Sequence, residues 1–294
     1  TGVQTCALPI LPGGITVDDA RFDAVRYQPS WPDSYRTGGT VGPIGALAVD
    51  EGYADPGART AVVGDPAVAT GERLRSLLIE RGIRVGPVTR GRAPEGATEV
   101  AAITSPRLDA IAGSILAASN NHGAEILLKD VAVHAGRPGT TRDGAAVATE
   151  RLARLGVPTD GLVMVDGSGL SRANRASCAT LDATIRLGER ERFRVLRDGL
   201  AVAGQRGTLA PRLGGTALEG RVTAKTGTLD GVSGLAGTTT VRRPLRFALL
   251  VNGEFGEARA YALREAMVAA IARYPDVTDD VSSIPGPDPV PNRG

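Results

Sequence analysis

Apolar residues recur at helical spacing through the middle of the chain, between about residues 105 and 200. A first helix is expected to start at Ser105-Pro106, because Ser caps a helix and Pro fits its first turn, and to stop near Ser119. A short buried strand is expected at 162–165. The same pattern predicts further helices around 124–131, over 141–155 with Gly156 as the stop, and over 180–198.

The last third of the chain has the alternating pattern of antiparallel strands. A strand at 222–225 leads towards Asp230-Gly231, a strong signal for a two-residue hairpin. The runs 232–241 and 245–251 are the expected next strands, and an amphipathic helix over 257–273 follows them.

The region 11–100 is dense in Gly and Pro. Its short apolar runs at 45–49 and 60–63 predict strands joined by long connections, with one helix within 69–82. We therefore expect a mostly β inserted region at 11–100 and a core at 101–275. The Pro-rich tail, 276–294, is expected to be disordered.

The first ten residues, TGVQTCALPI, resemble the in-frame translation of a sequencing-adapter oligonucleotide joined to a coding fragment. We expect native sequence to begin near Leu11, so Cys6 would be an artefact and the absence of a signal peptide would say nothing about location.

Composition excludes several classes of function. The chain has 294 residues, 42% of them hydrophobic, and a net charge of +2, so bulk electrostatics would not draw it to nucleic acid or to an anionic membrane. Two cysteines and two histidines are too few for a disulfide framework or for most metal sites, and no apolar run approaches a transmembrane length. No metal or cofactor is expected.

Two short motifs carry candidate chemistry. Ser119-Asn120-Asn121 ends a predicted helix, and Lys225-Thr226-Gly227-Thr228 ends a predicted strand. The basic residues include only two lysines, so Lys225 is notable, whereas Arg could supply charge almost anywhere. S-x-N and K-T-G in these contexts belong to the serine acyl-transferases that include penicillin-binding proteins and β-lactamases.

The residue types suit a substrate that ends in a carboxylate beside an amide. Lys225 gives positive charge for the carboxylate, and the hydroxyls of Thr226 and Thr228 can donate to it. Gly227 lets a substrate lie close to the strand as an extra strand. The backbone N–H near Thr228 can form half of an oxyanion hole. Ser119 can relay a proton to the leaving amine, and Asn121 can hold the substrate amide and a catalytic Lys.

Four segments resemble the D-alanyl-D-alanine carboxypeptidase/endopeptidase family of low-molecular-mass penicillin-binding proteins, whose transpeptidase core has inserted domains. They are GGITVDDARFD, SPRLDAIAGSILAASNNHGAEILL, DGSGLSRANR and RGTLAPRLGGTALEGRVTAKTGTLDGVSGLAG. The resemblance covers most of 11–275. It implies an α+β, penicillin-binding/β-lactamase-like fold, in which an antiparallel sheet with flanking helices carries K-T-G and a helical lobe carries S-x-N. It maps the family's catalytic and binding residues onto Ser119, Asn121, Lys225, Thr226, Gly227 and Thr228.

The family's nucleophile motif, S-x-x-K, is missing. Ile126 stands three residues before Lys129, and Val222 three residues before Lys225. We expect the parent protein to form an acyl-serine intermediate on a serine ahead of this chain, and this fragment to be inactive. The resemblance implies an exported protein that acts on peptidoglycan stem peptides and is inhibited by β-lactams. The alternatives are a β-lactamase or esterase on the same core, and a non-catalytic peptidoglycan-binding module.

Other polar residues have structural explanations. Asp166-Gly-Ser168-Gly is not G-x-S-x-G and is expected to form a Gly-rich turn. Glu125 and Lys129 are placed for a surface ion pair, and His122 is expected at the surface of a helix start. His134 and Cys178 have no assigned role, and Trp31 is expected to pack in the inserted region.

Overall fold

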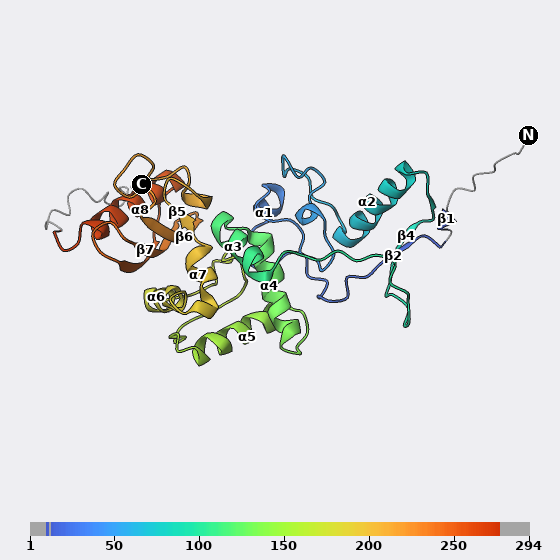
Figure 1. Cartoon of the computed structure of the whole chain (residues 1–294), viewed down its shortest axis with the longest axis horizontal. Helices are drawn as coiled ribbons and strands as arrows, with labels where there is room; N and C mark the ends of the chain where they lie inside the picture. The colour runs from blue at the N-terminus through green and yellow to red at the C-terminus, as the bar shows by residue number, and fades with distance from the viewer. Residues whose placement is uncertain (1–9, 12, 277–294) are drawn as a thin grey trace, which may run out of the picture. The chain divides into compact units, whose positions relative to one another are not determined.

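A computed structural model describes residues 10–11 and 13–276, which fall into two compact units (Figure 1). The first unit contains the chain up to residue 104 with 121–147 and 166–171, and the second unit contains 105–120, 148–165 and the chain from 172 onward. Two expectations, an adapter-derived start and a disordered tail, concern the two ends of the chain. Apart from Ile10 and Asp276, those residues lie outside the ones that the structure describes.

The second unit is built on a four-stranded antiparallel sheet of order β5-β6-β7-β8. Asp230 and Gly231 form the two-residue connection between β6 and β7, where Leu229 faces Val232, so the predicted hairpin is confirmed. Gly231 has a φ of 67°, a conformation that Gly adopts without strain. The strands are β5 (Ala201–Val202), β6 (Val222–Leu229), β7 (Val232–Thr239) and β8 (Leu245–Asn252).

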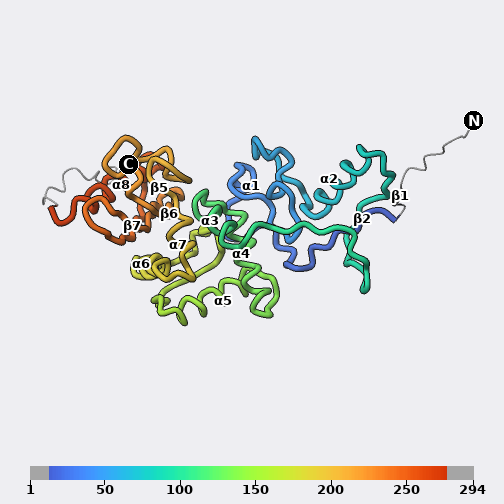
Figure 2. Tube along the Cα trace, viewed as in Figure 1, coloured from blue at the N-terminus to red at the C-terminus, as the bar shows by residue number. Residues whose placement is uncertain are grey.

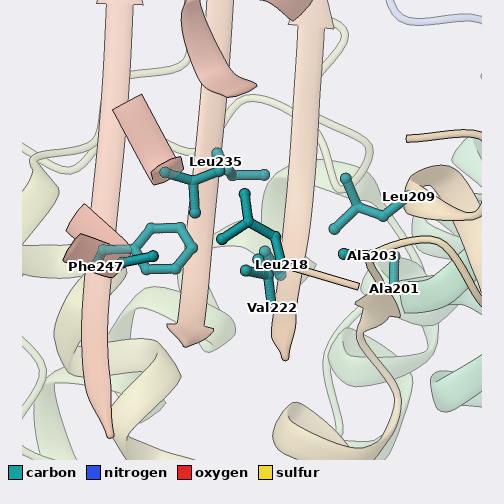
Figure 3. Close-up of a cluster of buried hydrophobic side chains, with 10 residues drawn as sticks. Ala201, Ala203, Leu209, Leu218, Val222, Leu235 and Phe247 are labelled. Carbon is teal, nitrogen blue, oxygen red and sulfur yellow. The ribbon is translucent and has the colours of Figure 1, made fainter. Parts of the chain in front are cut away.

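Helices cover both faces of this sheet. Helix α8 (Glu257–Arg273) shares a buried apolar core with the strands, in which Val222, Leu235 and Phe247 gather (Figure 3). Helix α6 (Cys178–Leu187) contacts β7 and β8, and its Asp182 meets Arg246, which alternates with Phe247 and so points to the opposite face. The expected class, an antiparallel sheet with flanking helices, is confirmed.

Three elements of the second unit differ from the predictions. Helix α3 (Leu108–Ala118) starts after Arg107, and the Ser105 hydroxyl donates to the Pro106 carbonyl at 3.1 Å and does not cap the helix. The expected helix 180–198 breaks at Gly188 into α6, a 3-10 turn η2 (Glu191–Phe193) and α7 (Val195–Asp198). The segment 162–165 forms one isolated bridge, Val163 with Arg175, in place of a strand.

The first unit has two small parallel strand pairs. Strand β1 (Ile10–Leu11) pairs with β3 (Arg84–Val85), and β2 (Ile15–Val17) pairs with β4 (Val88–Arg90). Its helices are α1 (Asp33–Thr37), a 3-10 turn η1 (Asp50–Gly52), α2 (Pro66–Glu80), α4 (Asn121–His134) and the first part of α5 (Thr141–Arg154).

The region before residue 105 has more helix and less strand than the pattern predicts. The strands expected at 45–49 and 60–63 are wrong, and the chain between α1 and α2 runs mainly as loops (Figure 2). The Val49 amide donates to the Thr70 hydroxyl of α2 at 3.1 Å, and Val62 makes a single bridge to Tyr53. Isolated backbone and side-chain hydrogen bonds therefore take the place of the strand ladder that a sheet would supply.

Within residues 13–276, every helix is too short or too polar to cross a lipid bilayer.

Candidate active site

Ser119 lies at the point where helix α3 ends. Its backbone is left-handed, with φ 55° and ψ 47°, and its N–H donates to the Ile115 carbonyl. A left-handed residue is a common helix C-terminus and turns the chain out of the helix. The side chain of Ser119 meets Lys225 from β6, with 2.5 Å between the hydroxyl oxygen and the lysine nitrogen. Two residues 106 positions apart thus meet within the second unit.

Lys225 is held by two oxygen acceptors. Its Nζ donates to Ser119 Oγ and, at 2.6 Å, to its neighbour's carbonyl, Thr226 O. Burial, reinforced by the positive charge of Arg264, lowers the pKa of Lys225 to about 8, compared with an ordinary value of 10.5. The ammonium is therefore poised to lose its proton at mildly basic pH.

The hydroxyl of Thr226 has a partner that sequence reasoning missed. Thr208 Oγ1 lies 2.8 Å from Thr226 Oγ1. Thr208 belongs to the 3-10 turn η3 (Gly207–Leu209), and Gly207 has a φ of 65°. A Cβ at Gly207 would overlap the carbonyl of Ala117 in the last turn of α3, so glycine allows η3 to approach that helix. The signal was present, since Gly207-Thr208 lies at the start of the longest segment of the family resemblance, directly after Arg206.

The end of β6 is an open edge. Strand β5 pairs with β6 at Thr223 and Ala224, and among the described residues no strand pairs with that edge from Lys225 onward. Gly227 is exposed, and a Cβ built on it would meet nothing closer than 4.0 Å. The Thr228 hydroxyl accepts a hydrogen bond from Arg264 Nη1 at 2.9 Å. An extended peptide could therefore add to this edge.

Asn121, the other predicted catalytic residue, belongs to the first unit. It opens helix α4, and its side-chain nitrogen donates to the Thr40 carbonyl at 2.9 Å. The unit boundary thus falls inside the S-x-N motif. The structure brings Ser119, Lys225 and Thr226 together, and it places Asn121 in a separate set of contacts.

Three polar residues on α4 were expected at the surface and are buried. His122 Nε2 lies 3.3 Å from the Pro43 carbonyl, and burial lowers its pKa. Glu125 accepts from the backbone N–H groups of Gly167 (2.9 Å) and Ser168 (2.7 Å), and burial raises its pKa. Lys129 forms an ion pair with Asp23, so the expected surface pair with Glu125 is wrong.

The Asp166-Gly-Ser168-Gly segment is a structural turn, as predicted. Asp166 is buried, and its carboxylate accepts from the N–H groups of Gly169 (2.9 Å) and Ser171 (2.6 Å). Trp31 Nε1 also donates to it at 2.8 Å, so Trp31 anchors the turn in addition to packing.

Within residues 13–276, no three or more His, Cys, Asp or Glu side chains cluster as metal ligands would. The free Cys178 is exposed in the first turn of α6.

Comparison with known proteins identifies relatives of one kind. The family model described as "D-Ala-D-Ala carboxypeptidase 3 (S13) family" matches residues 53–274. The D-alanyl-D-alanine carboxypeptidase of Actinomadura sp. (strain R39) is 36% identical over 246 residues, which are 80% of this chain and 45% of the relative. Carboxypeptidase DacB of Mycolicibacterium smegmatis is 31% identical over 252 residues, which are 81% of this chain and 54% of the relative.

Solved structures support the same fold. Penicillin binding protein 4 (dacB) from Haemophilus influenzae matches with a TM-score of 0.75 at 21% identity, covering 88% of this chain and 74% of that one. The same protein in complex with a β-lactam matches with a TM-score of 0.63 at 25% identity, covering 73% and 53% of the two chains.

The chain spans about half the length of the curated relatives it matches. The family model nevertheless covers the residues from Tyr53 to Tyr274, which include Ser119, Lys225 and their neighbours. This protein therefore belongs to the D-Ala-D-Ala carboxypeptidase 3 (S13) family.

Proposed function

We propose that this chain is the carboxylate-binding and proton-relay part of a serine-type D-Ala-D-Ala carboxypeptidase/endopeptidase. The observation that carries the proposal is the hydrogen bond between Ser119 and Lys225, because it couples a hydroxyl to a partly buried ammonium whose pKa is lowered to about 8. A hydroxyl in that setting can pass a proton to the amine that leaves when the D-Ala-D-Ala bond breaks. Asn121 would hold the amide of the substrate.

The substrate would bind along the open edge of β6. A peptide added there pairs with the strand backbone, and the exposed Gly227 leaves room for it. Its terminal carboxylate would face the Lys225 ammonium and the hydroxyls of Thr226 and Thr228. The backbone N–H of Thr228 would stabilise the oxyanion as the substrate carbonyl is attacked.

The attacking hydroxyl would come from an S-x-x-K serine that this sequence does not contain. In the complete reaction, that serine forms an ester with the penultimate residue and the terminal D-Ala leaves as a free amine, after which water hydrolyses the ester. The chain as given would therefore bind substrate without cleaving it, and sequencing the source locus upstream of the codon for Leu11 should reveal an in-frame S-x-x-K.

Peptidoglycan stem peptides are the proposed substrates, and β-lactams the proposed inhibitors of the complete enzyme. The Haemophilus influenzae relative solved with a β-lactam supports the second point. Export from the cytoplasm is proposed as well, because peptidoglycan lies outside the membrane.

Two alternatives remain on the same core. A β-lactamase would deacylate rapidly after reacting with penicillin, so the deacylation rate of the complete protein separates it from a carboxypeptidase. A non-catalytic binding module would bind the stem peptide equally well, and the absence of S-x-x-K upstream of Leu11 would favour it.

The direct test is binding of an N-acetylated peptide ending in D-Ala-D-Ala, measured by isothermal titration calorimetry. The free carboxylate should bind, and its C-terminal amide should bind about tenfold or more weakly, because the amide loses the charge that Lys225 recognises. Lys225→Met should abolish that preference.

A fluorescent penicillin should leave no covalent label on this chain. Equal binding of the acid and the amide would contradict the carboxylate site. Stoichiometric labelling would show that the chain carries its own nucleophile.

A further inference from the structure

A buried arginine lies directly behind the K-T-G-T segment. Arg264 is on helix α8 and is 6% exposed. Its Nη1 donates to the Gly227 carbonyl at 2.8 Å, to Thr228 Oγ1 at 2.9 Å and, on the paired strand β7, to the Gly234 carbonyl at 3.3 Å. One side chain thus fixes the end of β6 to its neighbour and to α8.

Among residues 13–276, no carboxylate lies within 4 Å of the Arg264 guanidinium, although buried charges are normally paired. Glu265 and Glu257 act on its charge only from farther away. Glu257 instead accepts a hydrogen bond from the Tyr261 hydroxyl, and Glu265 lies 3.7 Å from Arg212. The ring of Tyr261, whose centre lies 4.7 Å from the guanidinium carbon, makes a cation–π contact with Arg264. The positive charge of Arg264 is therefore not neutralised by a carboxylate in direct contact, and it can act on an anion at the β6 edge.

The contact also determines how the Thr228 hydroxyl can act. Arg has donors and no acceptor, so Thr228 Oγ1 must accept from Arg264, and its own hydrogen stays available for donation. An incoming carboxylate is an acceptor and needs that hydrogen. The same charge acts on Lys225, because Arg264 is the second cause of its lowered pKa after burial.

We propose that Arg264 is a positioning residue of the carboxylate site: it holds the Thr228 hydroxyl ready to donate and adds a second positive charge behind Lys225. This inference rests on the proposed function, because the anion it serves is the substrate carboxylate. Arg264 acts through Thr228 and Lys225 and does not itself touch the substrate.

The test uses the two lysines of the chain. Lysine-selective isotope labelling gives NMR signals from Lys129 and Lys225 alone, and Lys225→Arg assigns them. In Arg264→Gln, the Lys225 pKa should rise from about 8 part of the way towards 10.5, since one like charge is removed and burial remains. The dissociation constant of the D-Ala-D-Ala peptide should rise about tenfold.

The matched control is Arg212→Gln. The guanidinium carbon of Arg212 also lies over the Tyr261 ring, 3.9 Å from its centre, and Arg212 pairs with Glu265 at the surface. It should leave the Lys225 pKa and the peptide affinity unchanged. A folded Arg264→Gln variant with the wild-type Lys225 pKa would overturn the proposal.

Arg264→Lys covers the case in which glutamine prevents folding, because it keeps the charge. It should hold the Lys225 pKa near 8 and keep the peptide affinity within about threefold of wild type. A tenfold loss of peptide affinity in this variant, with the Lys225 pKa unchanged, would show that the second positive charge does not support binding, and would overturn that part of the proposal. If the wild-type chain binds no peptide, the proposed function fails. If wild type and Arg264→Gln bind it equally, only the role of Arg264 fails.

Discussion

The Ser119 hydroxyl accepts a hydrogen bond from the Lys225 ammonium, although the two residues come from the end of a helix and the middle of a strand. Neither motif explains the contact alone. The left-handed turn at Ser119 and the alternation of β6, which points Lys225 away from the apolar core beneath Val222 and Ala224, are both required.

Peptide binding should weaken as the pH rises through about 8. Lys225 attracts the substrate carboxylate only when protonated, and its lowered pKa places the loss of charge at that pH. Calorimetric titrations of the D-Ala-D-Ala peptide between about pH 6.5 and 9.5 check this. Affinity that is constant over this range would exclude Lys225 as the charge that is recognised.

The stability of the chain should depend on pH through the same lysine. Between about 8 and 10.5 the unfolded chain holds the Lys225 proton and the folded chain does not, so the free energy of unfolding contributed by this group rises with pH. Urea unfolding of wild type and Lys225→Met over that range measures the difference. Lys225→Met has no ammonium and so lacks this pH-dependent contribution. If the free energy of unfolding changed with pH in the same way in both proteins, the lowered pKa of Lys225 would be wrong.

Thr208→Val should destabilise the chain by about 1 kcal/mol, because the partly buried Thr226 hydroxyl loses its partner. Thr208→Ser retains the hydroxyl and should restore most of the stability. Both variants can be compared by urea unfolding and by affinity for the peptide. A valine variant as stable as wild type would show that the Thr208 hydroxyl, and its contact with Thr226, does not matter for stability.

Gly207→Ala should be among the most damaging small substitutions in the second unit, with a loss of about 2 kcal/mol or more. The positive φ disfavours any side chain, and the added Cβ would overlap the Ala117 carbonyl. Gly214→Ala is the control, since its φ is not positive and its Cβ would meet Gly204 Cα at an ordinary 3.7 Å. Thermal unfolding midpoints should separate the two variants clearly.

Glu125→Gln should gain stability relative to wild type as the pH rises. Burial raises the pKa of Glu125 above 4.5, so its contribution to folding is complete below 4.5 and is lost as the pH passes the folded-state pKa. Glutamine has no proton to lose and keeps an acceptor for the Gly167 and Ser168 N–H groups. Unfolding curves between about pH 4 and 8 test the trend, and a difference independent of pH would refute it.

The sheet of the second unit was predictable because its signals are local. Asp230-Gly231 specifies a tight hairpin, and the flanking residues alternate as antiparallel strands require. Ser119 and Lys225 were identified for the same reason, since each lies in a short motif that chemistry constrains.

The partners of the site residues were not predictable. Thr208 forms a hydrogen bond with Thr226, 18 positions away, and Arg264 forms one with Thr228, 36 positions away. Neither spacing has a sequence signature. The i,i+4 spacing of Glu125 and Lys129 is the same on a buried helix face as on an exposed one. Asp23 and the turn at Gly167, which make the face buried, come from remote parts of the chain.

The position of Arg264 on the last helix has a consequence for biosynthesis. The Gly227 carbonyl leaves the ribosome 37 residues ahead of the guanidinium that binds it, a delay of about 2 to 7 s at ordinary elongation rates. During that interval, the nascent β6–β7 hairpin lacks the contacts that tie Thr228 and Gly234 to α8. The proposed carboxylate site can therefore mature only after α8 has been translated, so its assembly is a late event in the folding of the nascent chain.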